Sequence, residues 1–508
     1  MSSPIVWLLP AIALCMQVQA QEPFGIQFID EQTKRPIPLV EIQTVHHLKL
    51  VSDNLGWIAI DEPELLNSRV FFDIRAHGYE FPKDGFGYAG KTILCAAGDR
   101  YQIELKRVQP AERLYRTTGL GRYVHSKKLG IDMTCTVDHS HNAIDFEYPV
   151  GCDSVLTAVL DQKRYWFWGD TQAIHHPLGG SFHMTGATTD VAYPSIDTQP
   201  PVYDYFRDNQ HRIRPMAQMP GEGPTWISGL VVVKDSNGKN TMLANYVKIR
   251  KGLKAYRWGF VRWNQLANRF DQAAEFDQPP KLFPASQVHT LEWTEPTEQI
   301  THVYLCGPFP NIRVLATEQS YLDPTQYQGF TCLEDGTTFE QRKLDRQPDG
   351  TLIYRWRRDT PPLTQSQEAT LVREKLLKDS ERRYRLLDAE SMREVQIHNG
   401  SVLWNPYRNA WSMIFTEKGG KKSLLGEIWY SESSNLEGPW TKAVKVASHD
   451  QYSFYNPMIH PVFGTDPGRT LYFEGTYTTT FSGNQNPTPR YDYNQILYRL
   501  NLDSLGLP

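Results

Sequence analysis

A strand–turn–strand unit occupies residues 153–170, which read Asp153-Ser-Val-Leu-Thr-Ala-Val-Leu-Asp-Gln-Lys-Arg-Tyr-Trp-Phe-Trp-Gly-Asp170. Val155 to Leu160 and Tyr165 to Trp168 are rich in β-branched and aromatic residues, which favour strands, and a polar turn separates them. Residues equidistant from the turn of an antiparallel hairpin lie side by side. The spacing therefore predicts that the carboxylates of Asp153 and Asp170 emerge close together at the open end of one hairpin.

Similar strand–turn–strand units recur from about Arg122 to the C-terminus. Five such units contain residues 153–171, 226–263, 302–314, 400–446 and 454–502. Radial repetition of sheets hides strand edges, so the pattern predicts a five-bladed β-propeller over residues 122–508. A β-sandwich or a parallel β-helix is the alternative fold. Residues 365–391 are rich in Glu, Lys, Arg and Leu, and they predict an exposed helical insertion between the third and fourth sheets.

The N-terminal part of the chain is organised differently. Residues 23–107 contain short strands separated by turn residues, which predicts a small all-β sandwich ahead of the propeller. Residues 1–20 predict a signal peptide, because the apolar stretch from Ile5 to Met16 is too short to span a bilayer and Val18-Gln19-Ala20 offers a cleavage site. The expected location of the mature protein is therefore periplasmic or secreted.

The composition of the chain argues against nucleic acid and membranes as binding partners. The formal net charge of −4 gives no support for a nucleic-acid partner or an anionic membrane surface. No later stretch is apolar enough to be a transmembrane helix, so we expect no membrane insertion. Aromatic residues make up 12% of the chain, enough to build strand cores and to offer flat surfaces for sugar rings.

Five cysteines follow the predicted cleavage site, and none forms a C-x-x-C pattern. Cys135 with Cys152, or Cys306 with Cys332, could pair in an oxidising compartment. Buried thiols are the other expectation.

Polar residues just before the innermost strand of each propeller blade converge on the central funnel. Three arguments select a set of candidates: this rule, the hairpin spacing, and the similarity between the strand ends Trp168-Gly169-Asp170 and Glu474-Gly475. The candidate catalytic acids are Asp153, Asp170, Glu222 and Glu474, and the candidate substrate-binding residues are Trp168, Trp226, His398, Asn456 and His460. Each has a structural alternative: the acids as turn residues or ion-pair partners, the histidines as core residues and the tryptophans as core packing.

Two resemblances follow from these motifs. The run from Ile29 to His77-Gly78-Tyr79 resembles transthyretin-like or carboxypeptidase-regulatory-like domains, which implies a structural companion domain. Asp153, the following strand and Tyr165-Trp-Phe-Trp-Gly-Asp-Thr171 resemble the first-blade hairpin of secreted five-bladed propeller glycosidases, above all the bacterial endo-D-arabinanases. That resemblance implies that Asp153 and Asp170 are the catalytic pair. The central general-acid glutamate of such families has no unambiguous equivalent in this chain.

The resemblance implies a hydrolase that cleaves glycosidic bonds of a polysaccharide or oligosaccharide, such as a furanoside, with one ionised and one protonated carboxyl group. No cofactor is required, although such propellers often hold a calcium ion on their axis. Two alternatives stay open. The chain is a non-catalytic propeller that binds carbohydrate or a surface protein, or it is a polysaccharide lyase that uses His398 or His460 as its base.

Overall fold

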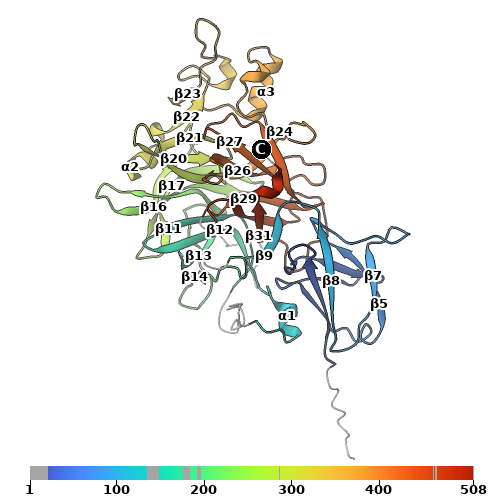
Figure 1. The fold of residues 1–508 in the computed structure, drawn as a ribbon. Helices are drawn as coiled ribbons and strands as arrows, with labels where there is room; N and C mark the ends of the chain where they lie inside the picture. The colour runs from blue at the N-terminus through green and yellow to red at the C-terminus, as the bar shows by residue number, and fades with distance from the viewer. Residues whose placement is uncertain are drawn as a thin grey trace, which may run out of the picture.

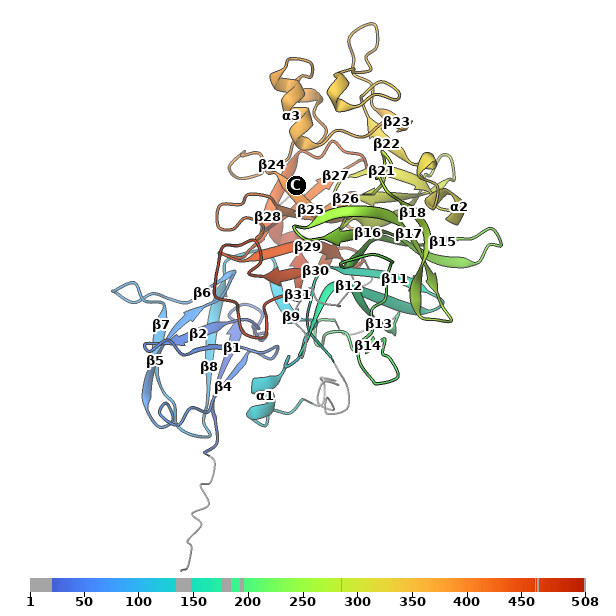
Figure 2. The same ribbon diagram turned by 180° about the vertical axis from the view of Figure 1, so that it is seen from behind.

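The computed structural model describes residues 21–133, 148–174, 184–191, 196–284, 286–461, 463 and 466–506. The predicted signal peptide lies outside these residues. The described chain is mostly β, which confirms the predicted all-β class (Figures 1 and 2). None of its helices is long and apolar enough to cross a membrane.

The first eight strands form two four-stranded sheets, in the orders β4-β1-β8-β6 and β3-β2-β5-β7. The strands are β1 (Phe24–Asp30), β2 (Glu41–Thr44), β3 (Lys49–Val51), β4 (Trp57–Ile60), β5 (Arg69–Arg75), β6 (Tyr79–Glu80), β7 (Gly90–Leu94) and β8 (Arg100–Arg107). Alternation drives this packing: in β8, Ile103 and Leu105 are buried while their neighbours Gln102 and Glu104 are exposed. Apolar side chains of the two sheets form one shared core.

The described residues from Glu112 onward form five further sheets, numbered here in chain order. Sheet 1 contains β10 (Pro149–Cys152), β11 (Val155–Leu160), β12 (Lys163–Ala173), β13 (Met184–Asp190) and β14 (Asp204–Tyr205). Sheet 2 contains β15 (Thr225–Lys234), β16 (Asn240–Arg250), β17 (Lys254–Asn264) and β18 (Arg269–Phe276). Sheet 3 contains β19 (His289–Thr294), β20 (Thr301–Cys306), β21 (Pro310–Leu315), β22 (Gln328–Thr331) and β23 (Arg355–Arg358).

Sheet 4 contains β24 (Leu387–Asp388), β25 (Ile397–Asn405), β26 (Ala410–Glu417), β27 (Glu427–Ser433) and β28 (Lys442–Ser448). Sheet 5 contains β29 (Ser453–Ile459), β30 (Thr470–Thr478), β31 (Asn494–Asn501) and β9 (Glu112–Arg116). The short helices are α1 (Val124–Lys128), α2 (Glu318–Tyr321) and α3 (Gln365–Arg373).

The five sheets follow one another around a common axis. Strand β11 packs against β15, β15 against β19, β19 against β25 and β25 against β29, and β29 contacts β11 again. The sheets therefore close into a ring, in a propeller-like arrangement (Figure 2). The loops that precede β11 and β19 meet at one end of this ring, together with residues near the start of β15 and Asn456 of β29.

Strand β9 closes the ring from the N-terminal side. It lies ahead of sheet 1 in the sequence, yet it pairs antiparallel with β31, the last strand of the chain. The buried Glu112 carboxylate of β9 lies 2.5 Å from the Arg499 guanidinium of β31 and accepts a hydrogen bond of 2.8 Å from Thr33 of the N-terminal sheets. This strand therefore joins the N-terminal sheets to the ring.

The expected helical insertion is shorter than predicted. Helix α3 ends at Arg373, and the chain passes through a left-handed residue at Lys375 before a turn at Asp379–Glu381. The charged face is not fully solvated, because Glu368 is buried and accepts the backbone N–H groups of Arg383 and Tyr384. This carboxylate holds the following loop against the helix.

Cys95, Cys152, Cys306 and Cys332 are buried free thiols in the described chain. Cys306 and Cys332 therefore do not form the disulfide that the sequence left open, and burial raises the pKa of Cys332 to about 11. Cys135 lies outside the described residues.

Candidate active site

The β11–β12 hairpin has the register that the sequence predicts. Val155 pairs with Trp168, and Leu160 pairs with Lys163 across the turn. Beyond the open end, the backbone N–H of Asp153 donates to the carbonyl of Asp170 at 3.0 Å, and the N–H of Gly169 donates to the carbonyl of Asp153 at 2.7 Å. The two aspartates are therefore neighbours across the hairpin.

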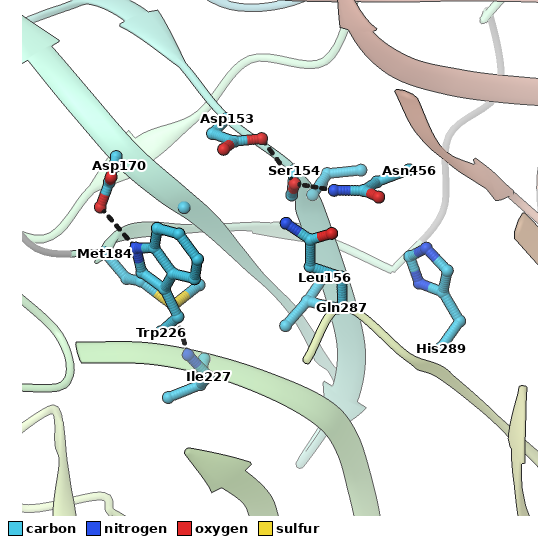
Figure 3. A pocket seen from close by; sticks show the side chains of 12 residues that line it. Asp153, Ser154, Leu156, Asp170, Met184, Trp226, Ile227, Gln287, His289 and Asn456 are labelled. Atoms are coloured by element: carbon cyan, nitrogen blue, oxygen red, sulfur yellow. Dashed lines mark hydrogen bonds between the residues drawn. The ribbon is translucent and has the colours of Figure 1, made fainter. Parts of the chain in front are cut away.

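Both carboxyl groups line one pocket at this end of the ring, with an empty space of about 420 Å³ (Figure 3). Asp153 and Asp170 form one side of it, and Trp226 and Ile227 come from the start of sheet 2. The remaining lining residues are Ser154, Val155, Leu156, Gly169, Met184, Gln287, His289 and Asn456. The loops ahead of β11 and β19 supply Asp153, Ser154 and Gln287, and the other polar groups come from within strands.

Hydroxyl groups surround the Asp153 carboxyl group. Ser154 Oγ donates to Asp153 Oδ1 at 2.6 Å, and Thr476 Oγ1 donates to the same oxygen at 3.2 Å. The hydroxyls of Tyr455 and Tyr493 also hydrogen-bond to this carboxyl group. Burial raises the pKa of Asp153, while each of these four donors favours its ionised form. Asp153 is therefore a partly buried residue whose carboxyl group has built-in donors for its negative charge.

Asp170 has a poorer set of donors. Its carboxyl group is buried, and the indole Nε1–H of Trp226 donates to Oδ1 at 2.9 Å. Burial and the neighbouring charge of Asp153 raise the pKa of Asp170 to about 7, although the indole bond lowers it. A carboxyl group with this pKa holds a proton for part of the time at neutral pH, so it is able to act as an acid.

The other polar lining residues are uncharged near neutral pH. His289 is buried, and burial lowers its pKa to about 4, so the ring is neutral. Its Nε2 atom is buried and has no hydrogen-bond partner among the described residues. None of the described lining residues is a lysine or an arginine. The pocket therefore offers two carboxyl groups and neutral polar groups, but no cation.

Four of the nine predicted site residues line this pocket: Asp153, Asp170, Trp226 and Asn456. Trp168, expected as a possible sugar platform, is instead fully buried in the core of sheet 1, where it stacks on Trp166 at a centroid distance of 6.4 Å. In a regular strand Trp168 and Asp170, two positions apart, would share a face. A β-bulge lies between them in the pairing of β12 with β13, so Trp168 faces the core while Asp170 lines the pocket.

Glu222 and Glu474 are not brought to the pocket lining. Glu222 is exposed in the loop ahead of β15, and its backbone carbonyl accepts the Tyr256 hydroxyl at 2.8 Å. Glu474 is buried, accepts the Thr117 hydroxyl at 2.9 Å and lies 3.1 Å from His460 Nε2. Thr476 shares its strand face and reaches Asp153, so Glu474 lies one pleat repeat, about 7 Å, further along β30.

The two predicted histidines also lie elsewhere. His398 occupies a β-bulge at the start of β25, and the next residue, Asn399, is the one that contacts Asn456. A β-bulge shifts by one residue which side chains point to a given side of the sheet. This shift explains why Asn399 makes the contact and the predicted His398 does not. His460 follows the far end of β29 and is buried beside Trp166 and Phe463.

Sequence reasoning missed His289, Gln287, Met184 and Ser154, which all line the pocket. The funnel rule would have selected His289, which begins the inner strand of sheet 3. That strand, His289–Thr294, alternates polar and apolar residues but was not recognised, because the third unit was read from residue 302 onward. Ser154 follows directly after Asp153 and carried no separate signal.

The described residues form no side-chain cluster of the kind that holds a metal ion. No group of three or more His, Cys, Asp or Glu side chains among them is placed to hold a metal ion. The carboxyl group of Asp153 is occupied by hydroxyl donors and that of Asp170 by an indole. We therefore assign no chemical step to a metal.

Solved structures similar to this chain include glycoside hydrolases. A GH43 β-1,3-galactosidase is 9% identical with a TM-score of 0.34, over 70% of this chain and 61% of that one. An exo-β-1,3-galactanase from Phanerochaete chrysosporium is 8% identical with a TM-score of 0.32, over 68% and 60% of the two chains. A GH43_1 enzyme from Xanthomonas citri, solved with xylotriose, is 11% identical with a TM-score of 0.32, over 70% and 90%.

This chain thus spans about three fifths of the length of the galactosidase and of the galactanase. No protein-family model and no curated protein matches it. The TM-scores lie below 0.5, so the fold and the site rest on the sheet topology and the pocket geometry.

Proposed function

We propose that this protein is a secreted glycoside hydrolase that acts in the pocket formed by Asp153 and Asp170. The observation that carries the proposal is the placement of two carboxyl groups side by side in one pocket, with the pKa of Asp170 raised to about 7. Paired carboxyl groups with different environments are what glycosidic bond cleavage needs.

In this proposal the two aspartates have different roles. Asp153 is the ionised partner, as nucleophile or as base for a water molecule, because four hydroxyl donors stabilise its charge. Asp170 donates its proton to the leaving oxygen or stabilises the transition state. The Trp226 indole holds the Asp170 carboxyl group in place at 2.9 Å.

The substrate is a neutral sugar unit of a polysaccharide or oligosaccharide, with furanosides as the first class to test. Uronates and phosphorylated sugars need a cationic partner, and the described lining residues contain none. Gln287 and His289 offer neutral polar groups to sugar hydroxyls, beside the apolar surfaces of Met184 and Trp226. Glu222, exposed ahead of β15, would contribute only if its loop moved toward the pocket.

The architecture that supports this function is a five-bladed propeller over residues 122–508, with β9 contributed from upstream. The cyclic contacts of five inner strands support this count. We assign residues 23–107 to a transthyretin-like sandwich, supported by two sheets with one core. Residues 1–20 are assigned as a signal peptide, and the mature protein as periplasmic or secreted.

A non-catalytic carbohydrate-binding propeller is the second candidate. The observation that favours it is the lack of a third carboxyl group among the described lining residues, since the resembling families use a separate glutamate as general acid. The lyase alternative loses support, because His398 and His460, its candidate bases, do not line the pocket.

The deciding experiment measures release of reducing ends from a panel of neutral polysaccharides. Asp153→Asn and Asp170→Asn should each remove nearly all turnover while the melting temperature changes by only a few degrees. Asp161→Asn is the matched control, since Asp161 is exposed at the turn of the same hairpin. Normal turnover in both site variants would exclude the proposal. Saturable glycan binding without turnover would favour the non-catalytic candidate.

A further inference from the structure

A directed chain of hydrogen bonds reaches the pocket from sheet 4. The backbone N–H of Gly400 donates to Asn399 Oδ1 at 2.8 Å. A backbone N–H is always a donor, so this bond fixes which end of the Asn399 amide is oxygen. The Nδ2 atom of Asn399 then donates to Asn456 Oδ1 at 3.1 Å.

The same direction continues into sheet 1. Because Asn456 accepts with its oxygen, its Nδ2 atom faces Ser154 and donates to Ser154 Oγ at 2.6 Å. The Ser154 hydroxyl is thereby left to donate its own proton, and it does so to Asp153 Oδ1 at 2.6 Å (Figure 3). Asn456 is 1% exposed, so both ends of its amide are used inside the protein.

Asn456 also contacts the other polar side of the pocket. The backbone of Asn456 hydrogen-bonds to the ring of His289, and this bond raises the pKa of the ring. The ring is therefore the donor and the Asn456 carbonyl is the acceptor. Since His289 Nε2 is the atom without a partner among the described residues, Nδ1 carries the proton. Nε2 of the neutral ring is then a lone-pair acceptor in a pocket wall.

We infer that Asn456 is a positioning residue that sets the hydrogen-bond direction of the pocket. It turns the Ser154 hydroxyl toward Asp153 and leaves His289 Nε2 as an acceptor. The Asp153 carboxylate and His289 Nε2 are then acceptors for the O–H donors of a neutral sugar. This last consequence rests on the proposed function, whereas the hydrogen-bond direction does not.

The position of Asn456 determines which substitutions are informative. Its φ angle is +51°, a left-handed conformation that Asn, Asp and Gly adopt with little strain. Asn456→Gly therefore removes the amide and keeps the backbone conformation, including the carbonyl that faces His289. Ser154→Ala removes the hydroxyl donor, and Thr476→Val removes a donor to Asp153 that does not depend on Asn456.

The test is a double-mutant cycle on the ligand-free protein. The pKa of Asp153 is followed by difference infrared spectroscopy of its protonated carbonyl, assigned with Asp153→Asn. All variants are made in an Asp170→Asn background, which removes the second carboxyl group from the pocket. The other titratable groups that face Asp153 are Tyr455, Tyr493 and Cys152, and the pKa of each is raised by burial.

Ser154→Ala should raise the pKa of Asp153 by about one unit, a roughly tenfold change in its protonation equilibrium. Asn456→Gly should raise it in the same direction, and should add nothing once Ser154 is alanine. The effects of Asn456→Gly and Thr476→Val should add. Additive effects of Asn456→Gly and Ser154→Ala would overturn the inference.

A second readout addresses His289. In protein labelled with ¹⁵N-histidine, above pH 5, Nδ1 of His289 should carry the proton and Nε2 should not, with His289→Gln used for assignment. A proton on Nε2 would also overturn the inference. Neither measurement needs a substrate. If the effects of Asn456→Gly and Ser154→Ala are coupled but the wild-type protein shows no turnover, only the proposed function is rejected. If the wild-type protein shows turnover but the two effects are additive, only this inference is rejected.

Discussion

At the scale of single residues, the most consequential feature is that Asp170 shares its buried environment with a second carboxyl group. Burial and the charge of Asp153 raise the pKa of Asp170 from 3.8 to about 7. Between these values the folded state binds a proton that the unfolded state has released. This carboxyl group therefore makes the folded state less stable as pH rises through that window.

We predict that Asp170→Asn removes this pH dependence. Relative to the wild type, the free energy of unfolding of the variant should be unchanged near pH 3 and should gain, on the order of 4 kcal/mol, by pH 8. Urea denaturation at a series of pH values measures it. A constant difference between the two proteins across that range would show that Asp170 titrates normally.

His289 makes a prediction about ligand affinity. The His289 ring lines the pocket and its Nε2 acceptor is buried and unpartnered among the described residues, so we propose that a hydroxyl of a bound sugar donates to it. His289→Leu should weaken binding of a neutral oligosaccharide by about tenfold, in line with the loss of about one hydrogen bond. Isothermal titration calorimetry measures this affinity, and His398→Leu, which changes a histidine outside the pocket, should leave it unchanged.

At the scale of elements, the hairpin was predictable and the facing of individual residues was not. The turn at Asp161 and Gln162 and the register of β11 with β12 follow from local strand propensity and spacing. The positions of His398 and Asn399 depend on a β-bulge, which the sequence does not mark. Likewise Trp168 and Trp226 are both strand residues, and only the fold separates them: Trp168 packs in the core shared by sheets 1 and 5, whereas Trp226 lines the pocket.

Substitutions of these two tryptophans should therefore have different effects on the stability of the fold and on the titration of Asp170. Trp168→Ala removes a fully buried side chain and should cost about 3–5 kcal/mol of unfolding free energy. Trp226→Phe removes the indole donor to Asp170 and should cost about 1 kcal/mol or less while raising the pKa of Asp170 further. Chemical denaturation and the alkaline limb of the pH–rate profile measure the two effects. Equal destabilisation by both variants would contradict this prediction.

At the scale of the whole molecule, the ring depends on a strand that the sequence order does not suggest. The repeating units downstream of Arg122 predicted the succession of sheets, but β9 lies upstream of them. Its five residues join sheet 5 only because Glu112 and Arg499 pair and the chain returns to complete the ring. Contacts between residues almost 400 positions apart are set by the closure of the ring, which local patterns cannot reveal.

The last prediction concerns this closing strand. A chain that begins at Gln109 keeps β9 and should fold, with lower stability because it lacks the N-terminal contacts of Glu112 and of Tyr491, whose hydroxyl donates to the Ser52 carbonyl at 2.6 Å. A chain that begins at Thr117 lacks β9 and leaves β31 as an open edge beside the apolar core of sheet 5. We expect that second chain to aggregate or to unfold at least 10 °C lower, because it loses a ladder of four residue pairs and the Glu112–Arg499 ion pair. Size-exclusion chromatography and thermal circular dichroism compare the two chains. Equal stability would mean that β9 covers the edge of sheet 5 without holding the ring closed.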